Sequence, residues 1–401
     1  MNKINLVYIR SKISSDPRLL DDQRKDYLNE LKKVYEISSD GEVYFFIESG
    51  GTEEEFRSIY SRCKEPYNLI ATDANNSLPA SLEIASFLKN KNLTYNLYHG
   101  RKEDIIDVLT KKRNTLKAKN FAYKSAERIL ENKRYGVVGK PSDWLISSDV
   151  DYKKAKEDLG VTLVDITFSE FKDEIDHAKS IVDPVVFKAK LNEKISEETL
   201  KVALNIYSAL YNIIKKHDLD GLTVRCFDLL GVYHNTSCLA LALLNEQGYI
   251  ATCEGDVPAM LTMGIIREKF HQSSFQVNPS FVNEKERYAY FAHCTIPLDM
   301  VISYKFDTHF ESGLGIGIAG ELNLAKITIF KVGSKLDKFE VFEGQISENL
   351  HRDNLCRTQL KIKFDEDISS LLDAPCGNHL IIFKGHHKTE LVDLLSKNKS
   401  I

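Results

Sequence analysis

The sequence changes its hydrophobic period near residue 284, and this change constrains the fold more than any other feature. Before it, short apolar runs such as residues 42–47 and 68–72 alternate with longer segments of helical period. After it, strand-like runs rich in Tyr, Phe, Ile and Val follow one another, with Gly, Asp and Asn turns between them. Strand–helix alternation is typical of a parallel α/β sheet, whereas consecutive strands are typical of an antiparallel sheet or a small barrel.

These periods predict an α/β fold with three domains. We expect residues 1–100 and residues 101–283 to form two parallel-sheet α/β domains of the Rossmann or flavodoxin-like kind. We expect residues 284–401 to form an antiparallel, β-barrel-like domain that ends in a helix. A chain of 401 residues is long enough for two or three domains with a core in each. Thr52, with Glu55 three residues later, also matches a capping box at a helix start.

Composition excludes several classes of partner. The 54 Lys and Arg residues are balanced by 58 Asp and Glu residues, which gives a net charge of −4 and no concentrated basic patch for a nucleic acid. No apolar run reaches the roughly 18 residues of a membrane span, and the run near the amino end is too short for a signal peptide. Seven cysteines without a CxxC pair predict free thiols in a reducing cytoplasm. We therefore expect a cytoplasmic protein that binds neither nucleic acid nor membrane.

Residues 315–320 match the GxGxxG pattern of dinucleotide-binding sites. That motif needs a strand before it and a helix after it, so that the helix amino terminus faces the pyrophosphate. Here the glycines lead instead into the strand-like segment AKITIFKV. A glycine-rich bend in the β-rich region is the better interpretation.

The segment IATCEGDVP, at residues 250–258, carries the clearest chemical signal. An apolar strand ends there in two carboxylates, Glu254 and Asp256, and a helix begins at Pro258. Ligands of open α/β sheets bind outside the carboxyl ends of the strands, so both acids lie where a site is expected. Asp256 falls near the N-cap position and can equally serve the helix. Glu254 precedes the cap, which favours a functional role.

Three histidines on predicted strands or turns could share a site with Glu254. They are His293, His309 and His379. A single histidine in a strand is more often a hydrogen-bonded core residue, but three beside a strand-end carboxylate favour a divalent metal site with nitrogen and oxygen ligands. The sequence contains no HxxxH or HExxH pattern, so the fold must bring such ligands together from distant segments.

Several ordered blocks resemble the L-fucose/L-arabinose isomerase family, in particular its short fucose-isomerase-like branch. The resemblance covers residues 136–385 and is carried by GKPSDWLISSD, CLALALLNEQGYIATCEGDVPAMLTM, SSFQVNP, AHCTIPLDM, THFESGLGIGIAGEL and PCGNHLIIF. It implies two α/β domains, a barrel-like carboxyl domain, and a site between the subunits of a homo-oligomer, which we expect to be a trimer or hexamer. It also implies Mn²⁺, or another divalent metal, and an enzyme that interconverts an aldose and its ketose through a cis-enediol.

The resemblance also implies roles for individual residues. Glu254 matches the carboxylate that is both metal ligand and proton-transfer group, and His379 in PCGNH matches a second ligand. His293 matches a ligand of the arabinose-isomerase branch. Such an arrangement suits the chemistry, because moving a proton between C1 and C2 requires a carboxylate and a Lewis acid that holds both oxygens.

The sequence departs from the better-known relatives at the strand SSFQVNP. The position of their second acidic ligand falls at Val277 or Asn278. An Asn carbonyl can coordinate a metal or orient a hydroxyl, but it cannot carry a proton at neutral pH. We therefore expect Asn278 as a metal ligand or polar site residue, with Asp256 or Glu311 as the second acid. His309 is a further candidate for substrate hydroxyl contacts.

Three alternatives remain beside an isomerase of a fucose- or arabinose-like sugar. One is an isomerase of a modified sugar such as sulfoquinovose, whose anionic group needs a positive partner, for which Arg225 or Arg10 is placed next to a predicted strand. Another is a non-catalytic sugar-binding or regulatory protein, which the Asn278 departure favours. A third is an accessory subunit of an oligomer. The uncharged or charged nature of the sugar does not follow from the net charge of the chain.

Overall fold

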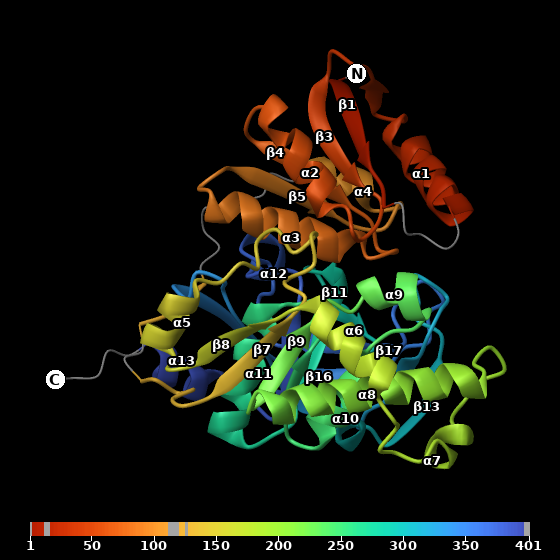
Figure 1. Cartoon of the computed structure of the whole chain (residues 1–401). Helices are drawn as coiled ribbons and strands as arrows, with labels where there is room; N and C mark the ends of the chain where they lie inside the picture. Colours follow the sequence, from red (N-terminus) through yellow and green to blue (C-terminus); the bar gives the residue numbers. More distant parts are fainter. Residues whose placement is uncertain (1, 12–16, 111–119, 125–126, 397–401) are drawn as a thin grey trace.

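The computed structural model describes residues 2–11, 17–110, 120–124 and 127–396 (Figure 1). Two parallel sheets and one closed antiparallel barrel form its framework, as the change of period predicts. The first sheet forms the red and orange lobe at the top of Figure 1, and the second sheet and the barrel lie below it. No helix among the described residues is long and apolar enough to cross a membrane.

The first sheet has five parallel strands in the order β2-β1-β3-β4-β5, which is the flavodoxin-like order. Its strands are β1 (Asn2–Ile9), β2 (Tyr35–Ile37), β3 (Glu42–Ile47), β4 (Tyr67–Ala71) and β5 (Tyr95–His99). Its helices are α1 (Pro17–Leu31), α2 (Glu53–Ile59), α3 (Ser77–Asn90) and α4 (Ile105–Thr110), with the short 3-10 turn η1 (Tyr60–Arg62) after α2. The prediction of a parallel sheet in this part of the chain is confirmed.

Helix α3 joins the first sheet to the rest of the molecule. All of its residues from Ser77 to Leu88 are buried, including the carboxyl-bearing Glu83. A helix that is buried on every side lies between two packed layers. Helix α3 contacts β5 of the first sheet and β11 of the barrel (Figure 1). This packing brings the loops at the carboxyl ends of β3 and β4 over the barrel.

The second sheet has four parallel strands in the order β10-β9-β7-β8. Its strands are β7 (Arg134–Val138), β8 (Thr162–Ile166), β9 (Gly221–Val224) and β10 (Ile250–Thr252). The helices around it are α5 (Tyr152–Asp158), α6 (Phe168–His177), α7 (Val185–Lys188), α8 (Glu197–Lys216), α9 (Asp228–Tyr233), α10 (Cys238–Glu246) and α11 (Val257–Phe270). Helix α11 begins directly behind β10, as Pro258 predicts, and it packs against both this sheet and barrel strands β15 and β18.

Six antiparallel strands close the barrel in the order β15-β18-β11-β12-β17-β16, and β16 returns to β15. Its strands are β11 (Phe275–Asn283), β12 (Tyr288–His293), β15 (Lys326–Val332), β16 (Lys338–Asn349), β17 (Thr358–Phe364) and β18 (Leu380–Lys384). Strand β6 (Phe121–Ala122) extends it at β16, and the remaining short elements are η2 (Leu298–Met300), α12 (Ser370–Asp373) and the closing helix α13 (Lys388–Ser396). Strand β11 lies in the range expected for the second α/β domain, but its hydrogen bonds place it in the barrel.

The glycine-rich segment 315–320 does not open a helix. Strand β14 (Gly317–Glu321) pairs antiparallel with β13 (Ser303–Asp307), so the segment lacks the helix amino terminus that a dinucleotide site requires. This confirms the interpretation as a β bend. The capping-box prediction is wrong, because the Thr52 hydroxyl donates to the Ser49 carbonyl and makes no side-chain cap.

Ile382 tests the contribution of the barrel to stability. Its side chain is fully buried in the main core, and truncation leaves a cavity that neighbouring strands cannot fill. We expect Ile382→Ala to lower the free energy of unfolding by about 2–5 kcal/mol. The control is Leu324→Ala, at a side chain that is 59% exposed, with an expected change within about 0.5 kcal/mol. Urea unfolding followed by circular dichroism measures both, and equal losses would contradict a packed barrel core.

Candidate metal centre and active site

Glu254 leaves the end of β10 in an uncommon backbone conformation. Its φ is 65°, and that of Gly255 is 74°, so two successive residues adopt the left-handed region. A Cβ atom on Gly255 would lie 2.6 Å from the Lys140 carbonyl oxygen, so this position tolerates only glycine. Such strain persists where the surrounding structure enforces it, and it is frequent at functional sites.

The loop after β7 holds the Glu254 side chain in place. The Trp144 indole N–H donates to Glu254 Oε2 at 2.6 Å, and the Ser142 amide donates to the Glu254 carbonyl at 2.9 Å. Arg225 fixes this loop through a two-pronged contact with Asp143, at 3.0 and 2.7 Å. With one carboxylate oxygen occupied by Trp144, Glu254 presents Oε1 to the barrel.

Three neighbouring barrel strands carry the other candidate ligands. Asn278 lies on β11 opposite Ala292, the residue before His293 at the end of β12, and Asn278 and His293 line the same chamber. His379 immediately precedes Leu380 of β18, which pairs with Val277 of β11. The antiparallel register therefore gathers an amide and two imidazoles, far apart in sequence, at one end of the barrel and below the end of β10.

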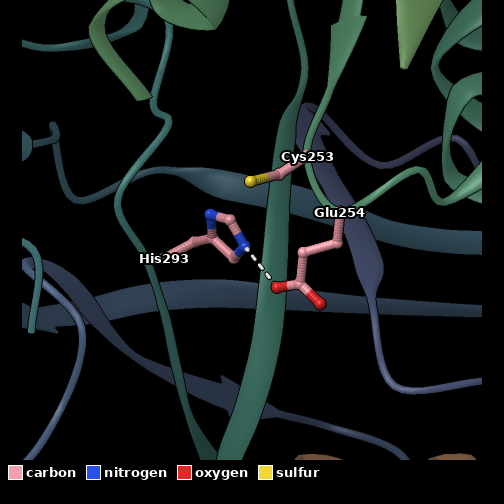
Figure 2. A group of neighbouring side chains, drawn as sticks. All are labelled: Cys253, Glu254 and His293. Carbon is pink, nitrogen blue, oxygen red and sulfur yellow. Dashed lines mark ion pairs between the residues drawn. The ribbon is translucent and has the colours of Figure 1, made fainter. Parts of the chain in front are cut away.

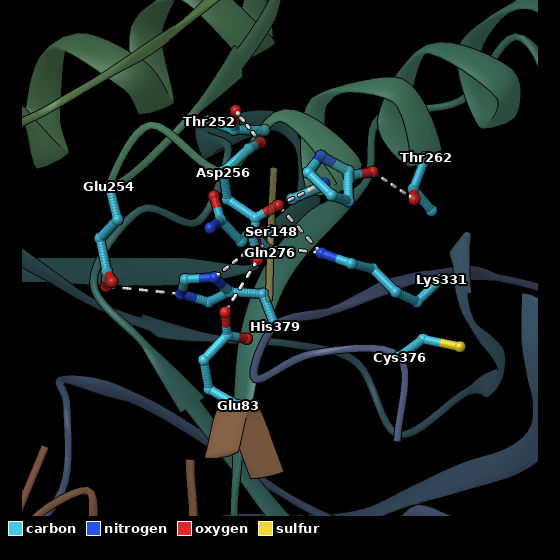
Figure 3. Close-up of polar contacts among 12 residues, drawn as sticks. Glu83, Ser148, Thr252, Glu254, Asp256, Thr262, Gln276, Lys331, Cys376 and His379 are labelled. Atoms are coloured by element: carbon cyan, nitrogen blue, oxygen red, sulfur yellow. Dashed lines mark hydrogen bonds and ion pairs between the residues drawn. The ribbon is translucent and has the colours of Figure 1, made fainter. Parts of the chain in front are cut away.

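His379 lies between two carboxylates (Figure 3). Its Nδ1 donates to Asp256 Oδ2 at 2.8 Å, and its Nε2 lies 3.4 Å from Glu254 Oε1. Asp256 also caps α11 by accepting from the Ala259 amide at 2.6 Å, and it forms an ion pair with Lys331 at 3.0 Å. The side chains of Asp256, Lys331 and His379 have no solvent exposure. The contact with Asp256 fixes the orientation of the imidazole and leaves its Nε2 facing Glu254.

The carboxylates and the histidines shift one another's pKa values. Burial opposes the charge of Asp256, but Lys331 and His379 outweigh it and hold the pKa of Asp256 well below its usual range. Burial likewise opposes the charge of Glu254, yet His379, His293 and Trp144 lower its pKa. Burial depresses the pKa of His293 to about 4, whereas Glu254 and Asp256 overcome burial at His379 and raise its pKa to about 9. The two carboxylates thus favour the protonated form of His379.

Cys253, Glu254 and His293 form a group whose potential ligand atoms all lie within 4.8 Å of one another (Figure 2). His293 Nε2 is 4.0 Å from Glu254 Oε1, and its Nδ1 is 3.0 Å from the Thr295 hydroxyl. The Cys253 sulfur is 3.0 Å from the sulfur of Cys226, and burial with this contact raises the pKa of Cys253 well above its usual value. Since only a thiolate is an effective ligand, the nitrogen and oxygen atoms are the better donors.

Two orphaned polar atoms complete the case for a cation at this point. His379 Nε2 and Asn278 Oδ1 are both buried, and neither has a hydrogen-bond partner among the described residues. Leaving buried polar groups unsatisfied is costly, and such groups in native proteins accompany backbone strain, a catalytic role, or a bound ion or water. One carboxylate, two imidazoles and one amide oxygen suit a divalent cation of the Mn²⁺ type. The residues present therefore fit a metal centre.

A cleft leads from the surface to this group. It contains about 820 Å³ of empty space, including part that is open to solvent, and a narrower inner chamber of about 460 Å³ adjoins it. Both are lined by Asn76, Phe227, Glu254, Asn278 and Glu311. The volume and the mixture of apolar and convergent polar groups are typical of a small-molecule site.

The structure brings most of the predicted site residues together and separates a few. His309 and Glu311 line the inner chamber, and Glu311 Oε1 accepts a hydrogen bond from the Asn76 amide at 2.8 Å. Asp256 lies behind His379 and contributes to neither lining. Arg225 does not line the cleft either, because Asp143 and Asp228 hold it against the loop after β7. Arg10 contacts Glu48 and Asp21 beside the cleft residue Ser11.

Sequence reasoning missed many of the cleft residues, among them four polar or aromatic ones that bear on the chemistry. These four are Glu53, Asn76, Trp144 and Asn378. Trp144 lies within GKPSDWLISSD, a segment that the resemblance singled out, and Asn378 directly precedes His379, so both had a signal. Glu53 and Asn76 come from the first sheet, outside the residues 136–385 that the resemblance covers, and no local pattern distinguishes them.

Comparison with curated proteins finds three relatives at low identity. Sulfoquinovose isomerases of Priestia aryabhattai and Priestia megaterium (strain ATCC 12872 / QMB1551) are each 21% identical over 281 residues, which cover 67% of this chain and 63% of theirs. A sulfoquinovose isomerase of Clostridium sp. (strain MSTE9) is 24% identical over 206 residues, or 48% of this chain and 45% of its own. These relatives are sugar isomerases. The chain spans less than two thirds of their length, and it matches no protein-family model.

The buried pair of Lys331 and Asp256 supplies a test of the site's framework. Lys331→Met removes the counter-charge of a buried carboxylate, so we expect a loss of about 3–5 kcal/mol in the free energy of unfolding. Lys331→Met combined with Asp256→Asn removes both charges and should recover most of this loss. Chemical denaturation at neutral pH measures each variant.

The matched control is Lys153→Met, which breaks an exposed pair with Glu157 and should change stability by less than about 1 kcal/mol. A Lys331 variant as stable as this control would show that the buried pair does not support the site.

Proposed function

We propose that the protein is a metal-dependent aldose–ketose isomerase that acts through a cis-enediol. The observation that carries the proposal is the unpartnered Nε2 of His379, which is oriented by Asp256 and faces Glu254 at the inner end of a cleft. The low-identity relationship to sugar isomerases supports the same reaction class.

The donor set indicates how a cation would be held. Glu254 Oε1, His379 Nε2, His293 Nε2 and Asn278 Oδ1 are the residues we assign as ligands, and Mn²⁺ is the ion we propose. A bound divalent cation supplies Lewis-acid stabilisation of the negative charge that develops on the two substrate oxygens.

Glu254 has the properties of the proton-transfer group. Its lowered pKa keeps it ionised at neutral pH, so it can accept the proton from C2 and return it to C1. Its position is held by Trp144 on one side and by the strained backbone on the other, which preorganises the carboxylate. Asn76 and Glu311 lie along the cleft, where they can bind sugar hydroxyls.

The sugar is proposed to be a fucose- or arabinose-like aldose, with a sulfonated hexose as the alternative. The names of the relatives support the second choice. Arg225 is fully engaged by Asp143 and Asp228, so it is a poor partner for a sulfonate. Arg10 is better placed, since its Nη2 is buried without a partner among the described residues and it adjoins Ser11 at the cleft.

A second candidate function is sugar binding without catalysis. Asn278 favours it, because this amide stands where the better-known isomerases carry a second acid. A screen for ketose formation over aldopentoses, 6-deoxyhexoses and sulfonated hexoses with added Mn²⁺ separates the two functions. Sugar binding without any ketose would support the binding protein and contradict the isomerase.

Glu254→Gln tests the proposed base directly. The amide is nearly the same size but accepts no proton, so we expect ketose formation to fall by at least about 10²-fold, with the circular dichroism spectrum unchanged. The control is Glu286→Gln, at an exposed turn residue, which should retain wild-type turnover. Residual turnover of Glu254→Gln near that of the control would remove Glu254 from the proton path.

Asn278→Asp tests whether this position faces the cation. A carboxylate binds Mn²⁺ more strongly than an amide oxygen does, so we expect the metal content after dialysis against a weak chelator to rise from wild type to Asn278→Asp. Asn278→Leu, which has no donor, should lower it. Inductively coupled plasma mass spectrometry measures all three proteins, and identical metal contents would exclude Asn278 from the ligand set.

A further inference from the structure

Glu53 is a cleft residue that neither the sequence patterns nor the proposed mechanism uses. It is the first residue of α2, in the loop region after β3 of the first sheet, and it lines the same cleft as Glu254. Its helix neighbours Glu54 and Glu55 are exposed, and Glu54 pairs with Arg57 on the surface. Acids in a first helical turn are common because they favour the helix dipole, but that role needs no burial.

Glu53 combines burial with an unpartnered oxygen and a place in the cleft lining. Buried Glu83 of α3 also has an Oε2 without a partner among the described residues, but it does not line the cleft. Its side chain is only 2% exposed, and its Oε2 has no hydrogen-bond partner among the described residues. The nearby buried Glu48, by comparison, is held by Arg10 and Arg24. Burial of a carboxylate without a compensating cation favours its protonated form. Burial, Glu83 and Glu254 together raise the pKa of Glu53 well above its usual value.

The other acids near the cleft each have a polar partner for at least one carboxylate oxygen. Asp256 is bound by Lys331, His379 and the Ala259 amide, and it lies outside the cleft. Glu311 accepts a hydrogen bond from Asn76. Glu254 is the proposed base. Glu53 thus combines a cleft position with an oxygen that has no partner among the described residues and with a raised pKa, which favours its protonated form.

We propose that Glu53 is the second proton-transfer residue of the isomerisation and takes the place of the acid that Asn278 lacks. The inference rests on the proposed function, which it deepens by assigning the proton transfers at the substrate oxygens. It also assigns a catalytic role to the first sheet, since α2 would reach over the metal centre from the lobe above it.

The proton balance of the reaction is simple. Glu254 takes the C2 proton as the C1–C2 double bond forms, and the Glu53 carboxyl protonates O1, which yields the neutral enediol. In the second half, Glu53 takes the proton from O2 as the C2 carbonyl forms, while Glu254 returns its proton to C1. Both side chains end as they began, and no oxidant, reductant or other reactant is consumed.

Glu53→Gln, with Glu55→Gln as the matched control on the same helix, tests the inference. We expect kcat of Glu53→Gln to fall by about 10²–10⁴-fold, while the Mn²⁺ content stays that of the wild type. The melting temperature should be equal or higher, because the amide avoids burying an ionisable group. Glu53→Ala should lose the same activity and regain part of it when formate is added as a small replacement acid.

Each outcome decides one of the two ideas. If wild-type protein forms no ketose from any sugar in the screen, the proposed function fails. If wild type is active and Glu53→Gln turns over within about threefold of Glu55→Gln, only the role of Glu53 fails. Loss of activity together with a lower melting temperature, and without rescue by formate, would assign Glu53 a structural role and overturn the inference.

Discussion

The hydrogen bond between His379 and Asp256 is the contact on which the site depends. It fixes the orientation of a fully buried imidazole and leaves Nε2 facing Glu254 across 3.4 Å. Lys331 makes this arrangement tenable, because it compensates the charge of Asp256 without reaching the cleft. The same carboxylate caps α11 by accepting from the Ala259 amide. Asp256 therefore contacts both α11, which follows β10, and His379, which precedes β18.

Each of the three sheets contributes something that the others lack. The second sheet supplies Glu254 at a strand end, with the strained turn that aims it. The barrel supplies Asn278, His293 and His379 from three strands adjacent in its hydrogen-bonding order. The first sheet and its loops supply further lining residues of the cleft, including Glu53 and Asn76. Buried helix α3 packs between the first sheet and the barrel. Its Glu83 accepts a hydrogen bond from the Ser147 amide of the loop after β7.

Local sequence patterns predicted some of the site residues and missed others. Glu254 was recognisable because a carboxylate that ends a buried strand has few structural reasons to be there. The role of Asp256 was harder to predict, because the sequence does not distinguish an N-cap residue from a catalytic acid. Its partner Lys331 is also 75 residues away in the chain. Arg225 was expected to meet a substrate anion, but the loop carrying Asp143 folds onto it. Glu53 carried no signal, because exposed acids follow it in the same helix turn.

By itself the sequence determined the classes of structure: two parallel sheets, a strand-rich carboxyl part, and a strand end that bears acids. These follow from short-range periodicity and turn chemistry, which act between residues close in the chain. Tertiary structure alone decided that β11 joins the barrel and that Asn278 and His293 line one chamber. It also decided that Glu53 is buried with an Oε2 that has no partner among the described residues. Those outcomes depend on which faces pack together, and packing joins residues that no local pattern relates.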